Sequence, residues 1–144
     1  MDKRIGKRIH YLANQNRAYV NAMLKEDGLT HGECNLLVEI YRNDGISQEE
    51  LVKKVRIDKS AITRVIKSMI EKGYVKKDIN QNDRRYHCLY LTNKANDKLD
   101  YIFEVFHKSS AWLLDGISEE DTIIVMRILD EMCENVRKKV EEIE

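Results

Sequence analysis

Apolar residues recur at intervals of three and four along most of this chain, a spacing that places them on one face of a helix. The clearest stripe lies within residues 58–72. Longer stripes of the same period run over residues 2–25, 93–115 and 118–143. The pattern predicts a mainly α-helical protein. The apolar face of residues 58–72 consists of Ile62, Val65, Ile66, Met69 and Ile70.

Capping signals divide this pattern into elements. A Ser or Thr followed three residues later by Glu is a capping box, and Thr30 with Glu33 and Ser47 with Glu50 both fit it. The two boxes predict a helix that begins after Thr30 and a short helix over residues 48–55. The first of these helices is expected to bury Leu36, Leu37, Ile40 and Tyr41.

Residues 48–72 are expected to form a helix-turn-helix. Asp58 is a favoured N-cap residue for the second helix, and Arg56 and Ile57 form a tight link before it. Gly73 is typical of a helix C-terminus. Two extended segments follow within residues 74–91, joined by a polar tip at 80–84, and they predict a two-stranded hairpin, or wing.

The outward face of the predicted helix over residues 58–72 carries short hydroxyls and cations. Such side chains reach phosphates and base edges in a major groove. Arg64 is the expected reader of a guanine edge, whereas the other members of the face are expected on phosphates. The alternative is a face that merely meets solvent. The candidate DNA-binding residues here are Ser60, Thr63, Arg64 and Lys67, with Lys59 beside them.

The charge is unevenly distributed, although the formal net charge of the whole chain is +0. From Lys53 to His87 there are eleven Lys and Arg against four Asp and Glu, a surplus of seven. The remainder of the chain therefore carries the compensating negative charge. A local basic patch of this kind is typical of a phosphate-binding surface.

The run DKSAITRVIKSMIEKGYVKKDINQNDRRYHCLYLTNKA resembles the winged-helix core of the MarR family of transcriptional regulators. The resemblance includes the Asp-x-Arg pattern at the wing tip, here Asp83-Arg84-Arg85, and the Leu-Thr that closes the wing. It implies a winged helix-turn-helix that binds double-stranded DNA, acting by family habit as a repressor rather than an activator. It also implies that N- and C-terminal dimerisation helices flank this domain.

The resemblance further assigns roles within the wing. Arg85 is implied to enter a minor groove, where a narrow groove attracts arginine, while Asp83 steadies the loop. Arg84 and Lys77 are expected to contact backbone phosphates. The alternative is a solvated loop in which Asp83 and Arg85 simply pair with each other.

The long apolar stripes near both ends exceed what one winged helix needs for its own core, so we expect them to meet a second copy of the chain. The expected division is residues 1–28 for N-terminal dimerisation, 29–92 for DNA binding and 93–144 for C-terminal dimerisation. Two recognition helices of a homodimer must lie roughly 34 Å apart to enter successive major grooves. We therefore expect the DNA operator to be pseudo-palindromic.

A small-molecule effector is implied by the resemblance alone. In the family it binds in a cleft between the dimerisation helices and the winged lobe, and shifts the spacing of the two lobes. Tyr11, Arg17 and Tyr41 are candidates to bind an anionic or phenolic effector. Ordinary packing or surface roles for these three residues remain the alternative.

A redox-responsive or a metal-responsive regulator on the same fold is the alternative. A redox sensor needs a reactive thiol, and Cys34, Cys88 and Cys133 are better explained as inert packing residues. A metal sensor could use His31, Glu33 and Cys34, with His107 approaching from another helix, but paired ligand spacing is absent. No cofactor and no metal site are therefore expected.

Composition excludes several classes of protein. The 144 residues include no proline and are 35% charged, and no apolar run reaches the roughly 20 residues needed to cross a bilayer. A cytoplasmic protein with no membrane partner is expected. No phosphate-binding glycine loop, nucleophile elbow or zinc-protease motif is found, which argues against an enzyme. A helical interaction protein that ignores DNA would leave the basic surplus unexplained.

Overall fold

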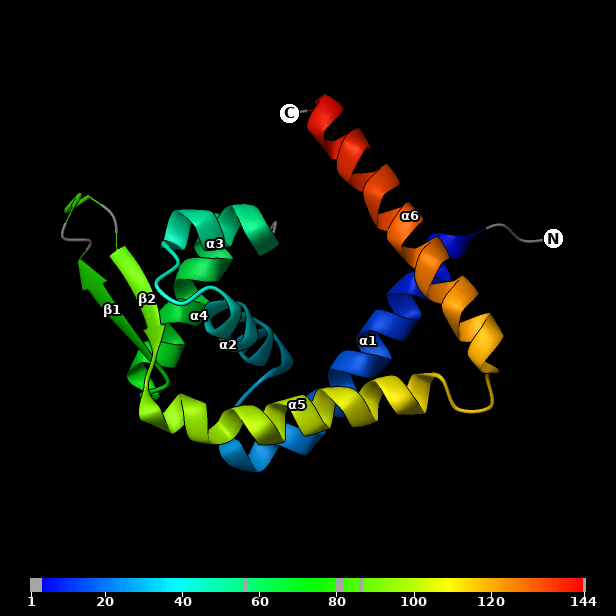
Figure 1. Cartoon of the computed structure of the whole chain (residues 1–144), viewed down its shortest axis with the longest axis horizontal. Helices are drawn as coiled ribbons and strands as arrows, with labels where there is room; N and C mark the ends of the chain where they lie inside the picture. The colour runs from blue at the N-terminus through cyan, green and yellow to red at the C-terminus, as the bar shows by residue number, and fades with distance from the viewer. Residues whose placement is uncertain (1–3, 56, 80–81, 86, 144) are drawn as a thin grey trace. The chain divides into compact units, whose positions relative to one another are not determined.

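The computed structural model describes residues 4–55, 57–79, 82–85 and 87–143, and its elements are labelled in Figure 1. The prediction of a mainly α-helical winged helix-turn-helix with a two-stranded wing is confirmed. The expected helix start at Asp2, the linker residue Arg56 and positions 80 and 81 of the wing tip lie outside the described residues. The elements in chain order are α1 (Ile5–Leu24), η1 (Lys25–Asp27), α2 (His31–Arg42), α3 (Gln48–Val55), α4 (Lys59–Glu71), β1 (Val75–Ile79), β2 (His87–Leu91), α5 (Asn93–Leu113) and α6 (Glu119–Ile143).

The predicted caps form and set the helix starts. Thr30 and Glu33 make a complete capping box at the start of α2. Before α3, Glu50 N donates to Ser47 Oγ at 3.1 Å and Ser47 N donates to Glu50 Oε2 at 3.0 Å. The Asp58 carboxylate accepts from the first backbone N–H groups of α4. Each cap satisfies donors that a helix N-terminus otherwise leaves without partners.

The turn from α4 into the wing is a Schellman motif. Gly73 adopts a left-handed conformation with φ +80°, which only glycine enters without strain. Its N–H donates to Ile70 O at 3.0 Å, and Tyr74 N donates to Met69 O at 2.9 Å. The chain is thereby reversed in a single turn, and β1 begins directly behind the C-terminus of α4.

The wing is an antiparallel pair in which Val75 lies opposite Leu91 and Ile79 opposite His87. A short bridge adds the segment before α3 to the other edge of β2, since Leu89 N donates to Ile46 O at 2.9 Å. The hairpin is therefore attached to the start of the helix-turn-helix as well as to its end.

The core lies between α1, α2, α4, α5 and the wing. On α4, Ile62, Ile66 and Met69 are buried and Val65 is half-buried, as predicted. The prediction was wrong for Ile70, which is 38% exposed because it lies at the edge of the apolar stripe. The buried apolar residues of α1, α2 and α5 include Val20, Leu24, Leu36, Leu37, Ile40, Leu99, Ile102 and Val105.

Tyr41 of α2 was also expected in the buried face, and this too was wrong. Its side chain is 52% exposed, whereas the neighbouring Ile40 is fully buried. Tyr41 lies in the last turn of α2, which ends at Arg42, so its side chain lies beyond the part of the helix that covers the core. It packs edge-on against Phe103 of α5, with ring centroids 5.9 Å apart.

The chain divides into two compact units, one ending at Ser109 and the other beginning at Ser110. The first contains the winged helix, α1 and most of α5, because these helices supply side chains to its core. The second contains α6, and in the described chain no residue of that helix is buried. Among the described helices, none has the length and apolar character to cross a membrane.

Candidate nucleic-acid interface

The outward face of α4 is open to solvent. The structure places Lys59, Ser60, Thr63, Arg64 and Lys67 on the surface, opposite the buried Ile62 and Ile66. The helical period therefore separates this face from the core as the sequence predicted. Three of its side chains are cationic, and two of these, Arg64 and Lys67, lie one turn apart.

Both hydroxyls of this face are engaged within the protein. The Ser60 hydroxyl donates to the Asp58 carboxylate, and Thr63 Oγ1 donates to Lys59 O at 2.9 Å. The hydrogen bond from the Ser60 hydroxyl, with a backbone bond from Ala61, lowers the pKa of Asp58. In this conformation each hydroxyl has already used its proton, so it can accept a hydrogen bond but cannot donate one to a phosphate.

Gln48, which the sequence reasoning missed, also belongs to this surface. Its Nε2 donates to Thr63 Oγ1 at 2.8 Å and so connects the first turn of α3 with α4. The two residues are fifteen positions apart, and no local pattern links them. The one available signal was the place of Gln48 at the start of a helix that packs against the recognition helix.

The wing tip is organised by Asp83 and Arg85. Arg85 Nη2 lies 2.7 Å from Asp83 Oδ2, and Arg85 Nε lies 3.0 Å from Asp83 Oδ1. The backbone N–H of Arg85 donates to the same carboxylate at 3.1 Å. The pKa of Asp83 is lowered by the Arg85 side chain and then by this backbone bond.

The pairing of Asp83 with Arg85, which the sequence left as an alternative to DNA contact, is therefore present. It does not remove the guanidinium from the surface, because the Arg85 side chain is 85% exposed. Arg84 and Lys77 are exposed as well. The wing thus adds cations to those of α4 and carries its arginine in a fixed, bidentate geometry.

Comparison with known proteins agrees with this geometry. The family model described as "MarR family" matches residues 29–87, which span α2 through the start of β2. A MarR protein from Peptoclostridium difficile superposes with a TM-score of 0.94, covering 100% of this chain and 94% of that chain at 26% identity. Residues 29–87 of this chain therefore match the MarR family.

Two further proteins are similar to this chain over most of its length. The uncharacterised HTH-type transcriptional regulator YdgJ of Bacillus subtilis is 28% identical over 109 residues, which are 76% of this chain and 66% of the relative. The chain thus spans slightly less than two thirds of that relative's length. A MarR-family protein from Listeria monocytogenes, crystallised in complex with a 26mer DNA, has a TM-score of 0.89 and 29% identity, covering 95% of this chain and 91% of that chain.

These matches confirm the expectation that this chain is no enzyme, because the matched proteins are named as transcriptional regulators. The chain is thus similar to MarR-family transcriptional regulators. The family match covers the helix-turn-helix and most of the wing, which are the elements that carry the exposed cations described above.

Beside the helix-turn-helix of this chain lies a cavity of 740 Å³. It is lined by residues of α1, α2, α3, α4 and α5 and is open to solvent on one side. Its polar side chains include the cations Arg17, Arg42 and Lys54 and the acid Glu39. Among the described residues, Glu39 Oε2 is a buried oxygen with no hydrogen-bond partner. The apolar part of the lining comprises Leu36, Val38, Val55, Ile57, Ala61, Ile62, Val65 and Phe106.

Only one of the three expected effector residues reaches this cavity. Arg17 lines it, whereas Tyr11 and Tyr41 lie outside its lining and are 63% and 52% exposed. Tyr11 precedes Arg17 by six residues, which turns it by about 240° around the helix. Tyr41 packs on Phe103 instead. The three residues therefore do not form one site.

His31 and Glu33 have partners other than a metal. His31 lies against Phe106 with ring centroids 6.0 Å apart, and burial, together with the charge of Arg17, lowers its pKa. The Glu33 carboxylate accepts hydrogen bonds from Ser68 and Lys72. Over the residues that the structure describes, no group of three or more potential ligands is arranged for a metal ion.

The three cysteines differ in exposure. Cys34 is fully buried, and burial raises the pKa of its thiol to about 12, which favours the unreactive protonated form. Cys88 is half-buried in β2. Cys133 is exposed on α6, so the expectation that it packs inertly is not met within a single chain.

Proposed function

We propose that this chain is a homodimeric, sequence-specific DNA-binding repressor of the MarR family. The observation that carries the proposal is the exposed face of α4, where Arg64 and Lys67 extend away from a well-packed core. A helix of this kind fits a B-form major groove. The Listeria monocytogenes relative that was crystallised with a 26mer DNA supports the assignment.

Each of the five residues on the outward face of α4 has a proposed role. Arg64 reads a guanine edge through two hydrogen bonds, and Lys59 and Lys67 contact phosphates. Ser60 and Thr63 order the start of the helix through their bonds to Asp58 and Lys59. Their oxygens remain able to accept hydrogen bonds from a base amine or a bridging water.

The wing extends the interface along the DNA. Arg85 enters the minor groove beside the α4 site, and Asp83 fixes its guanidinium before DNA arrives. Arg84 and Lys77 neutralise phosphates on either side. The exposed guanidinium of Arg85 and its bidentate contact to Asp83 support this role, since an arginine that is already ordered loses less entropy on binding.

Dimerisation is proposed through the helices near both ends of the chain. On α1, Ile5, Ile9 and Leu12 are 55%, 42% and 51% exposed, a degree of apolar exposure that favours a protein partner. A second copy of the chain is the proposed partner. The operator that this dimer binds is then a pseudo-palindrome with half-sites one DNA turn apart. The apolar residues exposed on α6 include Val125, Ile128, Leu129, Val136, Val140 and Ile143.

Release from DNA is proposed to follow binding of a small phenolic or anionic molecule in the cavity. Phe106 and the apolar lining would hold an aromatic ring, and Arg17 would attract a negative charge. A phenolic hydroxyl could donate to the buried Glu39 Oε2. The cavity contacts both α4 and α1, so a ligand that favours one arrangement of these helices changes the affinity for DNA.

The proposed site of action is the cytoplasm, where promoter DNA is accessible. Repression would arise because a dimer bound over a promoter excludes polymerase.

This proposal is tested by titrating the full-length protein against DNA from its own upstream region at several salt concentrations. We expect tight binding whose logarithm falls linearly with the logarithm of salt, since phosphate contacts release counterions. An unrelated DNA of equal length serves as the control. Equal affinity for both DNAs, or no binding to either, contradicts the proposal.

A further inference from the structure

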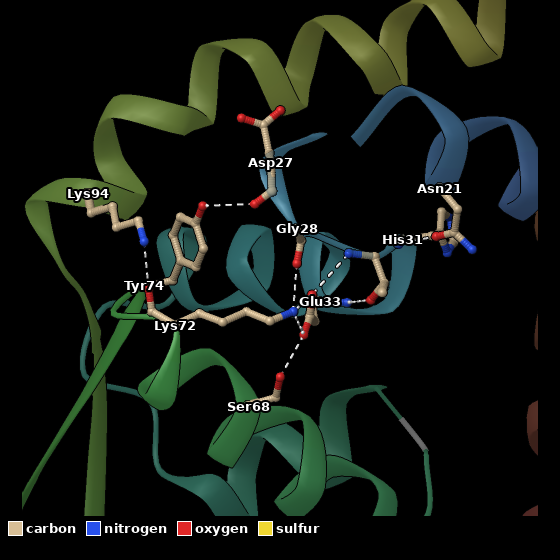
Figure 2. Close-up of polar contacts among 10 residues, drawn as sticks. Asn21, Asp27, Gly28, His31, Glu33, Ser68, Lys72, Tyr74 and Lys94 are labelled. Carbon is tan, nitrogen blue, oxygen red and sulfur yellow. Dashed lines mark hydrogen bonds and ion pairs between the residues drawn. The ribbon is translucent and has the colours of Figure 1, made fainter. Parts of the chain in front are cut away.

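The C-terminus of α4 is held by a buried carboxylate. Glu33 of α2 is 5% exposed, and one of its oxygens accepts from the Thr30 N–H at 3.0 Å in the capping box. The other oxygen accepts from Ser68 Oγ of α4 at 2.9 Å. Figure 2 shows Ser68 directed from α4 toward this carboxylate. Glu33 therefore does more than cap its own helix.

Lys72, the C-cap residue of α4, completes the attachment. Its ammonium lies 2.8 Å from Glu33 Oε1 and 3.0 Å from Oε2, and it donates to Gly28 O at 2.6 Å. Figure 2 shows the Lys72 side chain extended toward both residues. Gly28 ends η1 with φ +67°. The last turn of α4 is thus joined to the corner between α1 and α2.

The same turn is also joined to α5. Lys94 Nζ donates to Lys72 O at 2.7 Å and lies 4.5 Å from the centre of the Tyr74 ring (Figure 2). Next to this contact, Lys98 of α5 forms an ion pair with Asp27 of η1. The end of α4 is therefore bound to α2 on one side and α5 on the other.

These contacts fix the orientation of the last turn of α4 as well as its position. Apolar surfaces can slide past one another with little change in buried area, whereas hydrogen bonds weaken steeply when their angles change. Transfer of the Glu33 carboxylate out of water costs free energy, so its ion pair with Lys72 is weak evidence for a gain in stability. The pair does fix where the last turn of α4 lies along the corner between α1 and α2.

We propose that Glu33 and Lys72 are positioning residues that set the orientation of the recognition helix relative to α1, α2 and α5, and thereby the half-site spacing that the dimer accepts. This inference rests on the proposed function, because only a dimer with two recognition helices has a spacing to set. Neither residue needs to contact DNA. Their effect reaches the operator through the geometry of α4.

The test measures the affinity of the full-length protein for a series of operators whose half-site spacing changes by single base pairs. Wild-type protein should show a sharp optimum. In Glu33→Gln and in Lys72→Met, the preference for the best spacing over its neighbours should fall by about tenfold, the scale on which residues that couple two sites act. The two variants change the net charge in opposite directions, so a shared effect cannot come from charge.

Lys98→Met is the matched control. It removes a lysine–carboxylate pair at the same corner, but this pair joins α5 to η1 and includes no residue of α4, and the exposed fraction of its lysine is close to that of Lys72, at 37% and 36%. Its spacing preference should equal that of the wild type. Thermal unfolding of every variant reports any loss of stability separately. Ser68→Ala, a milder change, should reduce the spacing preference to a smaller extent.

The outcomes separate the two proposals. If Glu33→Gln and Lys72→Met lose stability but keep the wild-type spacing profile, the inference is overturned and the proposed function stands. If the wild type itself binds no DNA, or binds every spacing alike, the proposed function fails and the inference fails with it.

Discussion

Gln48 of α3 donates its side-chain amide to the Thr63 hydroxyl of α4 across 2.8 Å, on the surface that we propose faces DNA. Thr63 donates in turn to Lys59 O. These two bonds fix the Thr63 rotamer and connect the two helices of the helix-turn-helix by a polar contact outside the core. The recognition surface is therefore partly ordered before any DNA is bound.

Removal of this contact should weaken DNA binding more than it weakens the fold. Gln48→Ala and Thr63→Val should each cost about 0.5 to 1.5 kcal/mol of DNA-binding free energy, the usual net value of one hydrogen bond. The double variant should cost no more than the larger single loss, because both changes remove the same bond. Fluorescence anisotropy titrations measure all three. Additive losses would show that the two side chains act independently.

Arg64 and Lys67 should differ in the kind of binding they support. Arg64→Ala should lose about 1 to 3 kcal/mol on the operator and relax the preference for one base pair. Lys67→Ala should weaken binding to all sequences alike and reduce the salt slope by about 1. Affinities for an operator and for single-base variants, measured at several salt concentrations, distinguish the two. A uniform loss for Arg64→Ala would remove it from base recognition.

The wing arginine should act through its fixed geometry. Arg85→Ala should lose about 1.5 to 3 kcal/mol of binding free energy, the scale of a hydrogen bond to a charged group, and the loss should be largest on A·T-rich flanking DNA. Arg85→Lys keeps the charge but not the bidentate contact to Asp83, so it should recover only part of the affinity. Full recovery by lysine would show that charge alone matters.

Glu33 should make stability depend on acid pH. Burial raises the pKa of this carboxyl, but hydrogen bonds from Lys72, Thr30 and Ser68 outweigh burial, so the folded-state pKa lies below the ordinary value of 4.5. A carboxyl with a depressed pKa contributes stability that is present above its unfolded-state pKa and is lost as pH falls through its folded-state pKa.

The comparison of wild type with Glu33→Gln isolates this contribution. The difference in unfolding free energy, measured by urea denaturation, should be constant near neutral pH and shrink as pH falls below about 4.5. A difference that stays the same at every acid pH would show that the charge of Glu33 does not contribute.

Two positions of α2, four residues apart, should lose very different amounts of stability on truncation. Leu37 is fully buried, and Leu37→Ala should cost about 2 to 5 kcal/mol of unfolding free energy. Tyr41 is 52% exposed, and Tyr41→Ala should cost less than about 1 kcal/mol, which reflects its edge contact with Phe103. Equal losses of unfolding free energy at the two positions would contradict the observed exposure of Tyr41.

The features that could be predicted from the sequence are those set by nearby residues. The capping boxes at Thr30 and Ser47 form because their partners are three positions away, and the outward face of α4 follows from the helical period. The two extended segments and the polar tip between them predicted the wing, and the Asp83–Arg85 pair, which the sequence left as an alternative to DNA contact, is present in the structure.

The features that could not be predicted join residues far apart in the chain. Glu33 and Lys72 are separated by 39 positions, and Gln48 and Thr63 by 15. A capping role explained Glu33 fully at the level of sequence, so nothing indicated that its second oxygen accepts from another helix. The exposure of Tyr41 shows a different limit, because periodicity gives the direction in which a helical side chain points but not where along the helix the core ends, and Tyr41 lies in the last turn of α2.

The most direct test of the account is a footprint of the purified protein on an operator selected from a random DNA library. We predict two symmetric windows of major-groove protection about one DNA turn apart, flanked by minor-groove protection that Arg85→Ala removes. The major-groove windows should weaken with Arg64→Ala. A single window, or selected DNA that shows no shared sequence, would contradict the account.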